Sequence, residues 1–177
     1  MGRLKEGILQ VYTGNGKGKT TAALGQALRA VGHGFKVYMA QFMKSYGYGE
    51  VEAAKRLYPN LVIEQFGRTK HVNKEKPEKI DYGLAKKALL KAKKVLESGE
   101  WDIVILDEVN VALNFGLLSL DEVLELLKVK PKNVELIFTG RYAPKEVIDL
   151  AELVSEVVEI KHPYRSKGAK PRMGIEY

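Results

Sequence analysis

Residues 11–34 read VYTGNGKGKTTAALGQALRAVGHG, and they combine a short apolar run, a loop rich in glycine and lysine, and a helical pattern. The loop closes on Gly18-Lys19-Thr20, which is the G-K-[ST] ending of a phosphate-binding loop. The full motif, G-x-x-x-x-G-K-[ST], would place its first glycine at position 13, but this chain has Thr13 there and its glycine at Gly14. The stretch therefore predicts a strand, a modified phosphate-binding loop and a helix, in that order.

The loop contains the parts of an anion site. Gly14, Gly16 and Gly18 are expected to take positive φ values, which turn successive N–H groups toward an anion. The helix, expected to begin near Thr20, adds the positive end of its dipole. Lys19 supplies a point charge, and the Thr20 hydroxyl is a candidate magnesium ligand. We therefore expect the loop to hold nucleotide phosphates, with a flexible basic turn as the alternative.

Composition and charge limit the class of protein. The chain has 177 residues, 45% of them hydrophobic, and no cysteine, which predicts one globular domain over 1–177 without disulfides or thiolate metal sites. No apolar run is long enough to cross a membrane, so we expect a cytoplasmic protein with no membrane partner. The net charge of +7 suggests an anionic partner, although the lysines of the helical pattern at 84–96 are also typical of a solvated helix face.

Six apolar runs are bounded by turn residues, and most are separated by helical patterns. They cover residues 7–14, 36–44, 61–67, 101–109, 134–141 and 157–163. This alternation predicts an α/β fold with a mostly parallel sheet and helices on both faces.

Other segments carry helix or loop signals. The S-L-D-E at Ser119 is a capping box that opens a helix. Pro144 is expected in the first turn of another helix, whose buried side is predicted to contain Val147, Ile148, Ala151 and Val154. Residues 66–79 predict a long loop, and residues 162–177 predict an irregular basic tail that either folds over the site or frays.

A second half of the nucleotide site follows the apolar strand that begins at Ile103. This strand ends in Asp107 and Glu108, and in P-loop folds such a strand lies beside the loop, with one carboxylate holding magnesium directly or through water. Glu108 is then either the general base that orients a water molecule or a metal ligand. Arg141 closes the next strand, where it either contacts phosphate or pairs with an acid.

Five blocks together resemble the ATP:corrinoid adenosyltransferases of the cobalamin pathway, in order and over residues 7–177. The blocks are residues 11–34, QFMKSYGYGE, ILDEVNVALNFGLL, IFTGR and the closing GIEY. The resemblance implies a P-loop NTPase-like (RecA-like) fold. It also implies that cob(I)alamin attacks C5′ of ATP, which gives adenosylcobalamin and releases the whole triphosphate. A homodimer and a flavoprotein electron donor are further implications.

The resemblance also assigns roles to the site residues. Thr20 and Glu108 are implied to hold Mg²⁺, with Asp107 as an indirect partner, and Lys19 and Glu108 to carry catalysis. Because Co(I) has no proton to lose, the family chemistry favours Glu108 as a ligand over a base. The residues that the resemblance implies to bind the nucleotide are Gly14, Asn15, Gly16, Lys17, Gly18, Lys19, Thr20 and Thr21. Arg141 is expected to join them from its place after the next strand.

The chain departs from the family near the corrinoid. Relatives often have aromatic residues after the glycine that corresponds to Gly67, whereas this chain has residues 68–71, RTKH. Phe66 and Tyr82 are the nearby aromatics, and His71 is either a solvated loop histidine or a cobalt ligand. Longer members have an N-terminal segment over the corrinoid, while only MGRLKE precedes Gly7, so either other elements close the pocket or corrinoid binding is looser.

Two other functions compete with this one. Another P-loop phosphotransferase or a small ATPase would release ADP rather than triphosphate. A nucleic-acid-binding module is disfavoured because aromatic residues do not alternate with the basic ones, so we expect no specific nucleic-acid partner.

Overall fold

The computed structural model describes residues 4–177, apart from the side chains at positions 165 and 166, and the predicted domain's first three residues lie outside this range. Its described strands form one six-stranded sheet in the order β3-β2-β4-β5-β1-β6, and every neighbouring pair is parallel. The strands are β1 (Leu9–Thr13), β2 (Val37–Phe42), β3 (Leu61–Phe66), β4 (Ile103–Asp107), β5 (Glu135–Thr139) and β6 (Leu153–Glu156).

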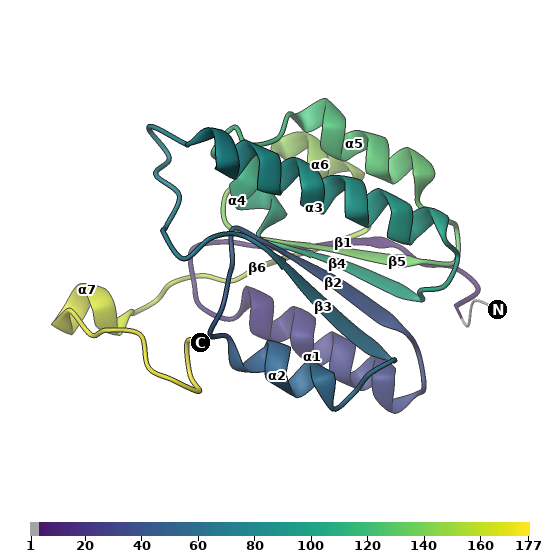
Figure 1. The fold of residues 1–177 in the computed structure, drawn as a ribbon, viewed down its shortest axis with the longest axis horizontal. Coiled ribbons are helices and arrows are strands. Elements are labelled where there is room, and N and C mark those ends of the chain that lie inside the picture. Colours follow the sequence, from purple (N-terminus) through teal and green to yellow (C-terminus); the bar gives the residue numbers. More distant parts are fainter. Residues whose placement is uncertain (1–3) are drawn as a thin grey trace.

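Helices cover both faces of the sheet (Figure 1). On one face lie α1 (Lys19–Gly32) and α2 (Gly49–Lys55). The other face carries α3 (Lys79–Glu97), α4 (Val109–Asn114), α5 (Leu120–Val129) and α6 (Lys145–Leu150). The predicted α/β fold with a parallel sheet and helices on both faces is confirmed. The tail, predicted to be irregular, contains the short helix α7 (Pro163–Lys167), which lies beyond the sheet.

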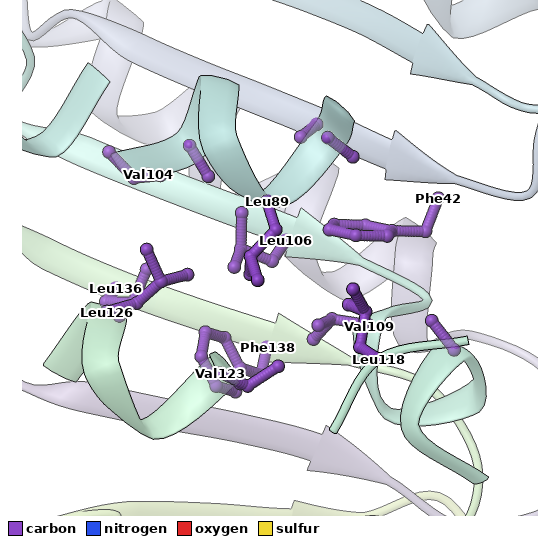
Figure 2. Close-up of a cluster of buried hydrophobic side chains, with 14 of the residues drawn as sticks. Phe42, Leu89, Val104, Leu106, Val109, Leu118, Val123, Leu126, Leu136 and Phe138 are labelled. Carbon is purple, nitrogen blue, oxygen red and sulfur yellow. The ribbon is translucent and has the colours of Figure 1, made fainter. Parts of the chain in front are cut away.

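The central strands divide the core into two layers because successive side chains point to opposite faces. Val104 and Leu106 of β4 belong to the larger cluster, which packs against α3 and α5 and is drawn in Figure 2. Ile103 and Ile105 belong to the cluster on the α1 face, where α1 contributes the small side chains of its buried alanines. Burial on both faces explains why these strands are continuous apolar runs.

Two sequence predictions after β5 are wrong. The last strand was predicted at 157–163, but β6 is Leu153–Glu156 and pairs with β1. Val154 was predicted on the buried side of a helix, whereas it is exposed in β6 because α6 ends at Leu150. All four residues of β6 are exposed at the edge of the sheet. Backbone pairing rather than burial defines this strand, so its sequence lacks the apolar signature.

The connection from β3 to α3 is long and contains no helix or strand between Gly67 and Glu78. Arg68 attaches it to the first turn of α3, because its Nε and Nη2 donate to Asp81 Oδ1 and Oδ2 at 2.7 and 2.8 Å. Its Nη1 donates to Glu78 at 2.9 Å. This bidentate contact with a buried carboxylate gives Arg68 a role in attaching the long loop to α3.

Candidate functional site

A pocket of about 760 Å³ opens at the carboxyl ends of the central strands. Its walls come from the loop after β1, the segments after β2, β4 and β5, and the end of the chain. Crevices at this edge are where open α/β sheets bind ligands. Gly14, Asn15 and Asp107 are not part of the lining. The predicted site residues that line it are Gly16, Lys17, Gly18, Lys19, Thr20, Thr21, Glu108 and Arg141.

The three loop glycines serve two different purposes. Gly14 and Gly18 have the expected positive φ values, 94° and 130°. Gly16 does not, so that part of the expectation is wrong. A Cβ on Gly16 would lie 2.7 Å from the carbonyl oxygen of Val158, and the N–H of Gly16 donates to the carbonyl of Val157 at 2.7 Å. Glycine is required there because the loop lies directly against the chain that leaves β6.

Lys19 lies inside the curve of the loop. Its Nζ donates to the carbonyl oxygens of Gly14 and Gly16 at 2.7 and 2.6 Å. Burial lowers the pKa of Lys19, while the negative charge of Glu108 opposes that shift. The loop therefore holds the ammonium at the pocket through its own backbone.

Asp107 is fully buried behind the pocket, and four protein donors surround its carboxylate. Oδ1 accepts from the hydroxyls of Thr20 and Thr139 at 2.8 and 2.6 Å. Oδ2 accepts from Lys44 Nζ at 2.7 Å and from Gln41 Nε2 at 3.3 Å. Each oxygen is engaged twice, so Asp107 can orient its neighbours but presents no free lone pair to the pocket.

Glu108 has the opposite environment. Its backbone is left-handed, with φ 65°, and its N–H donates to Thr139 Oγ1 at 2.9 Å. The side chain lines the pocket and makes no hydrogen bond or ion pair with any described group. Burial and the neighbouring charge of Asp107 raise the pKa of Glu108, against the opposing charge of Lys44. A carboxylate in this state is available to a cation that enters the pocket.

The donors at this point suit magnesium. Thr20 and Glu108 both offer oxygen, the ligand that Mg²⁺ prefers. Among residues 4–177 no group of three or more histidine, aspartate and glutamate side chains is arranged to hold a metal ion. Mg²⁺ in nucleotide sites uses one or two protein ligands together with substrate phosphates, so a pair of ligands is what this chemistry requires.

Sequence reasoning missed Lys44, which follows β2. Its ammonium also donates to Thr20 Oγ1 at 3.3 Å and lies 5.2 Å from the ring centre of Tyr48. Burial alone would lower the pKa of Lys44, but the charge and hydrogen bond of Asp107 raise it, so the amine stays protonated. One signal in the sequence could have found it: Lys44 ends an apolar run that predicts a strand, and ligand-binding residues gather at the carboxyl ends of such strands.

Arg141 is exposed and lines the pocket. Within the described part of the chain Arg141 makes no hydrogen bond or ion pair. The alternative expectation, that it pairs with an acidic side chain, is therefore not met among the described residues. The next residue, Tyr142, is left-handed with φ 61°. Arg141 is thus free to meet an anion in the pocket.

The end of the chain returns to the pocket. Of the two alternatives offered for the tail, folding over the site or fraying, this corresponds to the first. Residues 174–177 line the pocket, and Lys17 Nζ donates to the carbonyl oxygen of Ile175 at 3.1 Å. Arg172 holds this turn through Glu176, with Nη2 to Oε1 at 3.0 Å. His71 and His162 also line the pocket.

The aromatic residues near the long loop are placed differently. Phe66 is buried in the core and Tyr82 is 38% exposed on α3. Neither lines the pocket that contains the loop lysines.

The chain matches the family model described as ATP:corrinoid adenosyltransferase BtuR/CobO/CobP over residues 5–177. It is 37% identical to a corrinoid adenosyltransferase of Escherichia coli K12 over 174 residues, which are 98% of this chain and 87% of that protein. A corrinoid adenosyltransferase of Pseudomonas aeruginosa is 34% identical over 175 residues, 99% of this chain and 86% of the relative.

Among solved structures, the fold is similar to that of a RadB recombinase, with a TM-score of 0.57 and 16% identity. The superposition covers 90% of this chain and 78% of the recombinase. That likeness concerns the fold alone and agrees with the predicted P-loop architecture. No helix among the described residues is long and apolar enough to cross a membrane.

Proposed function

The chain belongs to the ATP:corrinoid adenosyltransferase family, and from that premise we propose that it transfers the 5′-deoxyadenosyl group of ATP to Co(I) of a reduced corrinoid. The family match over nearly the whole chain is the observation that carries the proposal. The pocket is consistent with it, because the glycine-rich loop and Glu108, whose side chain has no hydrogen-bond or ion-pair partner among the described residues, line the same pocket.

The reaction makes a Co–C5′ bond and breaks the C5′–O bond of ATP. Co(I) supplies the electron pair and becomes Co(III), and the pair from the broken bond leaves on the triphosphate oxygen. No proton moves, so the step needs no general base. The requirement is stabilisation of the negative charge that grows on the leaving triphosphate.

The chain offers three kinds of group for that charge. Lys19 is held at the loop by two carbonyl oxygens, and Lys17 reaches the same pocket. The loop amides at the start of α1 add the positive end of a helix dipole. Arg141 is exposed, lines the pocket and is proposed to contact the nucleotide. We assign Lys19 the largest share because its ammonium is the most buried of these side chains.

Thr20 and Glu108 are the residues that would hold Mg²⁺ with the triphosphate. When bound, Mg²⁺ supplies positive charge to the leaving group. Asp107 acts through Thr20, whose hydroxyl donates to it at 2.8 Å. This supports Asp107 as an indirect partner and Glu108 as the ligand, because Glu108 lines the pocket whereas Asp107 is buried behind it.

The family resemblance extends the proposal to the protein's surroundings. We propose a single cytoplasmic domain that works as a homodimer and receives electrons for Co(I) from a flavoprotein. Sedimentation of the purified protein and a reduction assay with a flavoprotein test these two points separately.

An anaerobic assay tests the central step. The protein is mixed with Mg²⁺, ATP and chemically reduced cobalamin, the Co(I) spectrum is followed, and the phosphate product is identified. Conversion to a light-sensitive alkylcobalamin with intact triphosphate is expected. Persistence of Co(I) while ADP and phosphate accumulate would refute the transfer and favour a small ATPase or another phosphotransferase. A protein-free mixture is the control.

A further inference from the structure

Lys44 lines the pocket, and neither the loop motif nor the proposed reaction explains its role. Its ammonium donates to Asp107 Oδ2 at 2.7 Å and to Thr20 Oγ1 at 3.3 Å. The side chain is only 15% exposed. A positive charge therefore stands beside the hydroxyl that would hold Mg²⁺.

The backbone places Lys44 there at a cost. Met43, directly before it, is left-handed with φ 57°, a conformation that is unfavourable for a residue with a side chain. Gly67 of the long loop packs against this bend so closely that a Cβ would lie 2.4 Å from the carbonyl carbon of Met43. Strain of this kind is concentrated at functional sites, where the surrounding structure enforces it.

The charges around Lys44 explain what such a placement does. Asp107 and Glu108 are adjacent acids in a partly buried site, and repulsion between them is a cause of the raised pKa of Glu108. The Lys44 ammonium offsets that repulsion when the pocket holds no other cation. A divalent cation on Thr20 and Glu108 would be repelled by it. A bound triphosphate would reverse the balance, because its charge attracts both cations.

We propose that Lys44 is a positioning residue that occupies the cation position in the nucleotide-free protein and makes divalent-cation binding depend on the triphosphate. The inference rests on the magnesium site of the proposed function. It concerns the order of binding and does not require that a corrinoid reacts. By linkage, the cation and the triphosphate each strengthen the binding of the other by one common factor.

The test measures binding without a corrinoid, so its failure is distinct from failure of adenosyl transfer. Free Mn²⁺ is counted by electron paramagnetic resonance with nucleotide-free protein, and tripolyphosphate binding is measured calorimetrically in EDTA and in Mg²⁺. Lys44→Gln removes the charge but keeps an N–H donor for Asp107. Its nucleotide-free form is expected to bind Mn²⁺ about tenfold more tightly than wild type, and tripolyphosphate in EDTA about tenfold more weakly.

A gain in Mn²⁺ affinity separates this role from a structural one, because damage to the site would weaken binding. Lys44→Arg keeps the charge and should behave as wild type, and Lys55→Gln, an exposed lysine of α2, is the matched control. Lys44→Met, which removes the charge and the donor, should show the same gain if Lys44→Gln fails to fold. Unchanged or weaker Mn²⁺ binding by the folded neutral variants would overturn the proposal.

Discussion

The two ends of the pocket are built in different ways. At the phosphate end, Lys19 and Asp107 are buried and are held by backbone carbonyls or by side chains from neighbouring strands. At the rim, the long loop and the end of the chain are held by contacts of Arg68 and Arg172, whose partners Glu78 and Glu176 are close in sequence. The end proposed to hold the nucleotide depends on the sheet, whereas the rim depends on loops, which tolerate change.

Lys19→Ala is the strongest test of the phosphate end. Removing a buried cation aimed at the leaving triphosphate should lower adenosyl transfer about 10³-fold and weaken tripolyphosphate binding. Turnover assays and calorimetry measure the two effects, with the exposed Lys55→Ala as the control. Retention of most activity would show that the phosphate end does not depend on this residue.

Gly16→Ala tests the packing of the loop against the chain after β6. Its Cβ would approach the carbonyl of Val158 within 2.7 Å, so the free energy of unfolding should fall by about 2 kcal/mol. Gly25→Ala in α1 is the matched control, because its Cβ would meet open space beyond the helix's own backbone, and it should raise stability by about 0.5–1 kcal/mol. Urea denaturation compares the two variants, and equal stabilities would contradict the packing argument.

Glu108→Gln tests the metal ligand. The amide is a weaker ligand than the carboxylate, so the Mg²⁺ concentration needed for half-maximal transfer should rise about tenfold. A Mg²⁺ titration of the transfer rate measures this. An unchanged Mg²⁺ response together with loss of ATP hydrolysis alone would instead make Glu108 a general base and the protein an ordinary ATPase.

Arg68→Ala tests the rim and should have the smallest effect on the phosphate end. Asp81, which is 1% exposed, loses two hydrogen bonds, so stability should fall by about 1–2 kcal/mol. Tripolyphosphate affinity should stay within about twofold of wild type, because the phosphate end is built from other segments. A large loss of affinity would mean that the two ends are coupled.

Sequence reasoning reached the family, the fold class and the loop, because each of these leaves a local signal. The G-K-T ending and the apolar run before Asp107 are short motifs with fixed spacing, and they are readable without knowledge of contacts. Lys44 was missed because its importance comes from Asp107, 63 positions away in the chain. The assigned roles of the site residues, among them Thr20, Glu108 and Arg141, stay predictions until the variants are measured.

By itself, the sequence located the strands at the centre of the sheet, since burial on both faces requires continuous apolar residues. It also determined that a phosphate loop precedes α1, since only glycine gives the backbone freedom at Gly14 and Gly18. Only the tertiary structure decided that β6 lies at 153–156, because an exposed edge strand is held by backbone pairing with β1. It also decided that Asp107 is enclosed while Glu108 lines the pocket, because β4 ends at Asp107 and the backbone of Glu108 is left-handed.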